Sequence, residues 1–294
     1  MNRIFWILTV TVGLMSCVKQ SSESKVEKQT FSNDKTLLSE GWMLQQRTEN
    51  FDGAAFSQNT FTNNDTWTEV NVPSTVLGAL VEAGVYKDVY TGFGLSKIDK
   101  EQFKSSWVYS KEFPLEQQEG QAVTLDLDGI NYYANVWLNG KLIADTSQLF
   151  GVYKQYELDI TEAIQDHNHL VIEVFPPIPG DFTIGFVDWA PVPADMNMGL
   201  WREVGVVVNK QVRLTETFVY ADFDVENPTE AVLFVSGKLT NTTAVPQEVV
   251  LNGEVDGQQF SYKTSLKANE SKVLKLSSKE VPQLVIVNPK LWWP

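Results

Sequence analysis

The sequence predicts an all-β protein made of two successive β-sandwiches, the first of them a jelly roll. Apolar and polar residues alternate with a period of two in short segments, most clearly over 123–127 and 134–138. Turn residues recur between these segments, and Asn139-Gly140 is a strong hairpin signal because both residues tolerate a positive φ. A proline-rich stretch over 175–201 then separates two groups of such segments.

Composition narrows the classes of partner. The chain has 294 residues, of which 43% are hydrophobic, so it can bury a substantial core. Its formal net charge of −14 gives no sign of the basic face that a nucleic-acid-binding protein needs, and it suits a neutral ligand.

The N-terminus has the pattern of a bacterial lipoprotein leader. A basic start and a short apolar run lead to Leu14-Met15-Ser16-Cys17, which contains the only cysteine. We expect a signal peptide over 1–16, acylation of Cys17, and a flexible polar tether over 17–35. The alternative is an ordinary signal peptide with an incidental cysteine.

The first sandwich is expected over 36–210. One helix is predicted, with Ser74 as its N-cap and Gly84 after its end. The hairpin at Asn139-Gly140 should return the chain to the apolar face at Leu142, and further strands are expected over 170–175 and 204–208.

The stretch over 175–201 cannot form a regular strand because five prolines interrupt it. A loop of this length in a compact domain is usually functional. It carries three aspartates, Asp181, Asp188 and Asp195, and we expect the first and the last to be solvated.

Alternation returns in the second sandwich, expected over 211–294. Residues 231–255 read as two strands joined around Asn241 to Thr243. The boundary between the sandwiches is placed near Lys210.

The order of several motifs resembles the N-terminal part of glycoside hydrolase family 2, in the branch of the β-mannosidases, endo-β-mannosidases and exo-β-glucosaminidases. The resemblance covers about residues 37–294. The motifs include Val72-Pro73-Ser74-Thr75, Trp107-Val108-Tyr109, Asp188-Trp189, Met198-Gly199-Leu200-Trp201-Arg202 and Leu291-Trp292-Trp293-Pro294.

This resemblance implies a galactose-binding-like jelly roll, an immunoglobulin-like sandwich and then a (β/α)₈ barrel that carries two catalytic glutamates. The chain stops before the barrel, so we expect no catalytic residue in it and an incomplete immunoglobulin-like sandwich with an unpaired sheet edge. Whether the chain acts as an enzyme is therefore left open. Asn269-Glu270 matches the family's Asn-Glu pair only superficially, and its polar surroundings predict a turn.

The same resemblance implies that Asp188 binds hydroxyls of the terminal sugar, as a carboxylate that accepts two hydrogen bonds can do. Trp189 either stacks on a sugar face or packs the loop onto the domain. Val187 stands where many β-mannosidases have tryptophan. Trp107 and Trp201 are expected in the core, and Arg202 in an ion pair with a loop carboxylate.

No cofactor is expected, since the sequence has no glycine-rich phosphate loop. The two histidines, His167 and His169, lack the further ligands of a metal site and are expected at the surface or in a turn.

We therefore expect a carbohydrate-binding accessory part of a family 2 glycoside hydrolase. Its parent would cleave β-linked mannosides or glucosaminides exolytically. The expected partners are a terminal β-linked sugar, the membrane through the lipid anchor and a separately encoded barrel, in the cell envelope. The alternative is a lipid-anchored carbohydrate-binding or scaffold module without catalysis.

Overall fold

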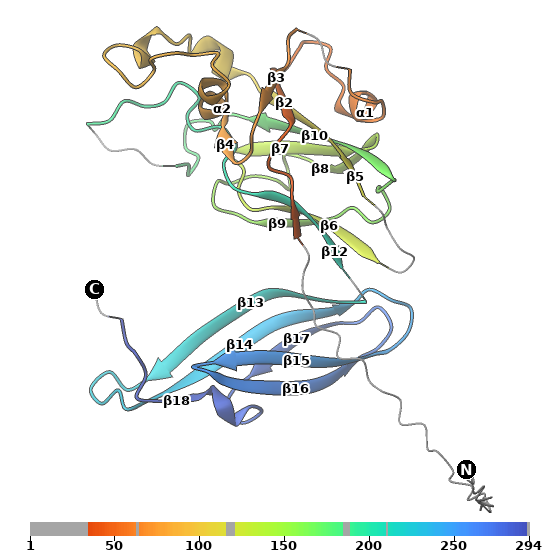
Figure 1. Cartoon of the computed structure of the whole chain (residues 1–294), viewed down its shortest axis with the longest axis vertical. Helices are drawn as coiled ribbons and strands as arrows, with labels where there is room; N and C mark the ends of the chain where they lie inside the picture. The colour runs from red at the N-terminus through yellow and green to blue at the C-terminus, as the bar shows by residue number, and fades with distance from the viewer. Residues whose placement is uncertain (1–34, 63–64, 116–120, 185–188, 210, 293–294) are drawn as a thin grey trace, which may run out of the picture. The chain divides into compact units, whose positions relative to one another are not determined.

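The structure is a computed structural model that describes residues 35–62, 65–115, 121–184, 189–209 and 211–292 (Figure 1). Strands hold 45% of the residues and helices 9%. All pairs of strands in the described part are antiparallel. The all-β prediction is confirmed. The predicted signal peptide and Cys17 lie outside the described residues.

Two sheets stack in the first sandwich (Figure 1). One has the order β3-β2-β5-β10-β7-β8, with β2 (Trp42–Gln46), β3 (Thr68–Val70), β5 (Trp107–Pro114), β7 (Tyr133–Leu138), β8 (Lys141–Ala144) and β10 (His167–Phe175). The other has the order β1-β12-β6-β9, with β1 (Lys35–Leu37), β6 (Ala122–Leu127), β9 (Tyr156–Asp159) and β12 (Val204–Asn209). The predicted alternation is visible in β7, where Ala134, Val136 and Leu138 are fully buried.

Strand β10 lies inside the six-stranded sheet, between β5 and β7, and its residues 168–174 are buried without alternation. Both faces are covered, because the short helix α1 (Gly53–Ser57) packs on β10 and β7. A Cβ on Gly53 would lie 2.5 Å from the Trp137 ring, so only glycine allows this close approach.

The predicted helix is α2 (Val76–Glu82), and its buried face holds Val76, Leu77, Ala79 and Leu80. Its N-cap is Thr75 rather than Ser74, because the Thr75 hydroxyl accepts from the Gly78 backbone N–H at 3.1 Å. Ser74 instead belongs to β4 (Ser74–Thr75), which pairs with β11 (Gly199–Leu200). The described residues also contain three 3₁₀ turns, η1 (Leu95–Lys97), η2 (Glu101–Lys104) and η3 (Pro282–Leu284).

The hairpin between β7 and β8 forms at Asn139-Gly140, where both residues have positive φ. The expectation for Leu142 was wrong, since its side chain is 54% exposed. Leu142 stands opposite Trp137, so both project from the outer face. An irregularity in the register brings Ala144 opposite the buried Val136, and Ala144 takes the core position.

The second set of sheets begins after Asn209 and has its own core. One sheet has the order β13-β14-β17, with β18 also paired to β14, and the other consists of β15 and β16. The strands are β13 (Val212–Phe223), β14 (Glu230–Asn241), β15 (Gln247–Val255), β16 (Gln258–Leu266), β17 (Ser271–Leu276) and β18 (Val285–Val287). The two strands expected over 231–255 correspond to parts of β14 and β15.

Two predicted boundaries, the end of the tether and the border between the sandwiches, can be compared with the structure. Lys35, the last residue of the predicted tether, already begins β1 opposite Val207, and its ammonium lies 2.7 Å from the Asp128 carboxylate. Lys210, near the predicted boundary of the sandwiches, lies outside the described residues.

Candidate functional site

The long loop between β10 and β12 is the candidate site. It leaves the sheet after Phe175 and returns through β11, which pairs with β4 just before helix α2. The pairing of β4 with β11 therefore joins the returning end of the loop to the start of the helix.

Asp195 anchors this loop and is not solvated as predicted. Its side chain is 1% exposed. One carboxylate oxygen accepts from the Leu77 N–H at 2.8 Å, in the first turn of α2, and the other accepts from the Asn197 N–H at 3.0 Å. Burial raises the pKa of the Asp195 carboxyl, which the backbone hydrogen bonds oppose. The carboxylate therefore fastens the loop to the helix.

Asn131 makes a second anchor on the other side of the loop. Its amide nitrogen donates to the carbonyls of Met196 and Asn197 at 3.1 and 2.8 Å. Its backbone N–H donates to Gly199, and the N–H of Gly199 donates back to Asn131. The returning half of the loop is therefore held along its backbone.

Asp181, predicted to be solvated, is half-buried and fixes the outgoing half of the loop. It accepts from the Tyr133 hydroxyl at 3.0 Å and from the Ile178 N–H at 2.8 Å. The nearby Phe182 ring contacts Tyr153 at 5.8 Å between centroids, and Phe182 is still 77% exposed. This half of the loop is therefore held by the hydrogen bonds of Asp181 and exposes the ring of Phe182 to solvent.

Trp189 is 86% exposed. A tryptophan that packed the loop onto the domain would be covered, so its indole is available for a ligand or a partner. Asp188, the residue before it, lies outside the described residues. Two further aromatic side chains, Tyr90 and Phe93, are 84% and 83% exposed on the segment that follows α2.

The structure agrees only in part with the expectations for Trp107, Trp201 and Arg202. Trp107 is buried, but Trp201 is only half-buried, and its indole N–H donates to the Val152 carbonyl at 3.0 Å. The Arg202 guanidinium lies over the Trp201 ring, 4.4 Å from its centroid. Within the described part of the chain Arg202 forms no ion pair, so the predicted pairing with a loop carboxylate is not found there.

The two histidines have different environments. His167 is exposed as predicted, whereas His169 is 4% exposed. Its ring nitrogens lie 2.8 Å from the Ser110 hydroxyl and 2.7 Å from the Asn59 carbonyl. Among the described residues no group of three or more His, Cys, Asp or Glu side chains could hold a metal ion. No helix in those residues is long and apolar enough to cross a membrane.

The pair Asn269-Glu270 forms a turn, as its polar surroundings predict. Asn269 has a φ of 55°, and the Glu270 carboxylate accepts from the Lys267 N–H at 2.6 Å.

Sequence reasoning missed the anchoring roles of Asp195 and Asn131. Asp195 accepting from Asn197 is a local Asx-type turn, and the spacing Asp-x-Asn was visible in the sequence. The contacts of Asp195 with Leu77 and of Asn131 with residues 196 and 197 join distant segments, so no local pattern indicates them.

Comparison with known proteins finds similarity to the N-terminal parts of glycoside hydrolases. Residues 55–183 match a family model described as glycosyl hydrolase 2 galactose-binding domain-like. An exo-β-D-glucosaminidase of Streptomyces avermitilis is 30% identical over 230 residues, which cover 78% of this chain and 25% of that protein. A mannosylglycoprotein endo-β-mannosidase of Lilium longiflorum is 26% identical over 88% of this chain and 30% of that protein.

Among solved structures, the exo-chitosanase of Amycolatopsis orientalis superimposes with a TM-score of 0.77 at 28% identity, covering 89% of this chain and 30% of that one. The resemblance drawn from the order of the motifs is confirmed, as is the galactose-binding-like class of the first sandwich. The chain spans about a quarter to a third of the length of these relatives.

Proposed function

We propose that this chain, whose residues 55–183 belong to the galactose-binding-like domains of glycoside hydrolase family 2, is the N-terminal sugar-binding part of a β-glycosidase of the β-mannosidase and exo-β-glucosaminidase type. The substrate would be a glycan with a terminal β-linked mannose or glucosamine. In this proposal the chain supplies binding and bracing to the active site.

The observation that carries the proposal is the anchored loop with an exposed tryptophan beside Asp188. Asp195 and Asn131 hold the base of the loop, and the Trp189 indole stands 86% exposed beyond it. An indole face covers the apolar face of a pyranose ring, while a carboxylate accepts hydrogen bonds from two neighbouring hydroxyls. Trp189 and Asp188 together therefore suit the end of a sugar chain.

Hydrolysis in this proposal belongs to polypeptide outside these 294 residues, because the relatives are about three times as long. A retaining glycosidase needs two carboxyl groups about 5–5.5 Å apart. We propose that a barrel supplies both, either as a continuation of the polypeptide or as a separately encoded partner.

The location is part of the same proposal. Acylation of Cys17 would anchor the protein to a membrane of the cell envelope, with the sandwiches held off the surface by the polar segment that follows. Metabolic labelling with an alkyne fatty acid should mark the wild-type protein in the membrane fraction. Cys17→Ala should remain unlabelled, and equal labelling of both would refute the anchor.

The sugar-binding role is tested with the soluble chain from Val18 onward. Titration with mannose- and glucosamine-terminated disaccharides should give weak, millimolar binding, since only half of a pocket is present. Trp189→Ala and Asp188→Ala should each abolish the amide-signal shifts that this binding causes in residues 189–198. Trp292→Ala is the matched control, because Trp292 is equally exposed at 84%.

Assays with aryl β-mannoside, β-glucosaminide and β-galactoside distinguish the alternatives. The proposal expects no release by this chain alone. Turnover that Asp188→Ala abolishes would place the catalytic carboxylates in this chain and overturn the proposal. Micromolar binding without turnover would favour a stand-alone carbohydrate-binding module.

A further inference from the structure

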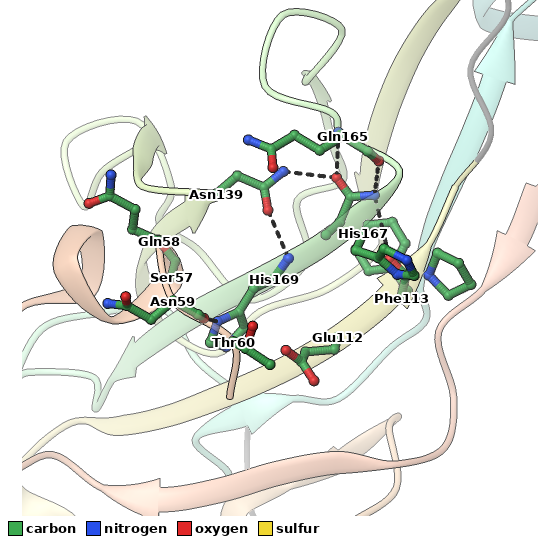
Figure 2. Close-up of a pocket in the computed structure, with 12 residues that line it drawn as sticks. Ser57, Gln58, Asn59, Thr60, Glu112, Phe113, Asn139, Gln165, His167 and His169 are labelled. Atoms are coloured by element: carbon green, nitrogen blue, oxygen red, sulfur yellow. Dashed lines mark hydrogen bonds between the residues drawn. The ribbon is translucent and has the colours of Figure 1, made fainter. Parts of the chain in front are cut away.

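A polar hollow lies at the opposite end of β10 from the Trp189 loop. Its volume is about 540 Å³, and it is lined by the segment after α1, the end of β5 and the turn before β10 (Figure 2). The loop leaves β10 after Phe175, whereas the hollow surrounds His167 and His169 at the start of the strand. Eight residue steps along a strand span roughly 27 Å. The hollow is therefore a separate place on the first sandwich.

The floor of the hollow is a closed network of hydrogen bonds. Asn168 is 2% exposed, and its amide oxygen accepts from the Asn139 amide and from the Gln165 N–H, both at 2.9 Å. The Asn139 amide oxygen in turn accepts from the His169 N–H at 2.9 Å (Figure 2). Because these partners satisfy one another, the floor is fixed without a ligand.

His169 ties one wall to this floor. The Asn59 carbonyl can only accept, so Nδ1 of His169 carries the proton, and neutral Nε2 then accepts from the Ser110 hydroxyl. Burial lowers the pKa of His169, in keeping with a neutral ring. Phe56 and Phe61 pack against the same ring. His169 is therefore a positioning residue that holds residues 58–60 beside the strand.

The rim, by contrast, carries polar groups with unused hydrogen-bonding capacity. The side chains of Gln58, Gln165 and His167 are exposed and make no hydrogen bond with any described residue. Glu112 uses one carboxylate oxygen to accept from the Phe61 N–H at 2.9 Å, which leaves the other open. Figure 2 shows these side chains around one hollow.

We propose that this hollow is a second saccharide-binding site, which takes a short amino sugar such as a glucosamine disaccharide. Each carboxamide of Gln58 and Gln165 both donates and accepts, as neighbouring sugar hydroxyls do. The Glu112 carboxylate is the one formal charge among the lining side chains when the histidines are neutral, and it attracts an ammonium group and repels phosphate. The volume lies within the usual range of ligand pockets, about 300–1,000 Å³.

The site is independent of the Asp188–Trp189 proposal, so its test uses the soluble chain with Trp189→Ala, which removes the other site. Addition of β-1,4-linked diglucosamine should shift the amide signals of Asn139, Asn168 and His169. Gln58→Ala and Gln165→Ala should each raise the Kd about threefold to tenfold, as the loss of one hydrogen bond does. Gln258→Ala, an exposed glutamine of β16, is the matched control and should leave the Kd unchanged.

Glu112→Gln tests the charge while it keeps the oxygen that accepts from Phe61. It should raise the Kd for diglucosamine about tenfold and leave the Kd for mannobiose within twofold. An absence of shifts at Asn139, Asn168 and His169 on addition of diglucosamine would overturn the second site. Equal effects of Gln165→Ala and Gln258→Ala would also overturn it, and neither result would touch the Trp189 proposal.

Discussion

The two sandwiches are built from similar alternating strands but differ in how completely their cores are covered. In the described residues the first core holds 34 buried side chains and the second holds eight. The second also has an apolar groove of about 290 Å³ between its sheets, lined by Leu214, Leu233, Leu251 and Phe260 among others. Val219 and Val273 are 54% and 63% exposed on the same strands.

This difference between the two cores determines which sandwich can hold buried polar side chains in fixed positions. Of the buried polar residues among those described, only Asn241 belongs to the second sandwich, while Asn131, Asn168, His169 and Asp195 are among those of the first. A buried polar group is stabilising only when surrounding atoms fix its partners. The dense first core provides such surroundings, and both candidate sugar sites rest on it.

The largest expected effect comes from removing a large side chain of the first core. Trp42 is fully buried, packs edge-on against Tyr109 and donates to the Leu38 carbonyl at 2.7 Å. Trp42→Ala should lower the free energy of unfolding by about 3–5 kcal/mol. Urea unfolding followed by far-UV circular dichroism measures it. A loss below about 1 kcal/mol would mean that the two cores are equally loose.

Asp195 gives the next effect, because it joins the core to the Trp189 loop. In Asp195→Ala the N–H groups of Leu77 and Asn197 lose their acceptor, which should cost about 1–3 kcal/mol. Hydrogen exchange should speed up in residues 176–198 and in the first turn of α2 more than in β5. Asp222→Ala, an exposed aspartate of β13, is the control and should change neither region. Uniform faster exchange would argue against a local anchor.

Much of this division was predictable from the sequence. Period-two alternation located β6, β7 and β15, and Asn139-Gly140 located the hairpin, because both signals are local. The exposure of Leu142 was missed because its face depends on the register across the turn, which places it opposite Trp137. Local sequence patterns therefore predicted where strands and turns lie better than they predicted on which face of the sheet a side chain lies.

The residues of the candidate site show more clearly what could not be predicted from the sequence. The sequence indicated the loop and Trp189, but it presented Asp181 and Asp195 as solvated and His169 as a residue of the surface or of a turn. Each of these is held by a group far away in the chain, Asp181 by Tyr133, Asp195 by Leu77 and His169 by Asn59. Burial of a polar side chain depends on such distant partners, which no spacing rule contains.

The stability of the first sandwich should depend on pH because the Asp126 carboxyl of β6 is partly buried. Burial raises the pKa of this carboxyl to about 6, with Lys35 opposing the rise and Glu157 and Asp128 adding to it. A raised pKa means that the folded state holds the proton more tightly. Its contribution therefore falls as the pH rises from about 4 to about 6.

Asp126→Asn should remove this loss. The variant should be more stable than the wild type by about 1 kcal/mol at pH 7.5, a value reduced for partial exposure, and nearly equal to it at pH 4. Thermal unfolding at the two values of pH measures the difference. A gain of the same size at both would show that the charge of Asp126 is not the cause.

The smallest expected effect concerns the outer face of the second sandwich. Phe218 is 62% exposed, and its ring lies 6.2 Å from that of Tyr220, which stacks on Phe234 at 4.7 Å. Since the phenyl ring of Phe218 is largely in water already, Phe218→Ser should change the free energy of unfolding by no more than about 0.5 kcal/mol. Urea unfolding under the conditions used for Trp42→Ala gives the comparison directly. A loss near 3 kcal/mol would show that the rings of Phe218, Tyr220 and Phe234 are covered in solution. The two sandwiches would then differ only in the size of their buried cores.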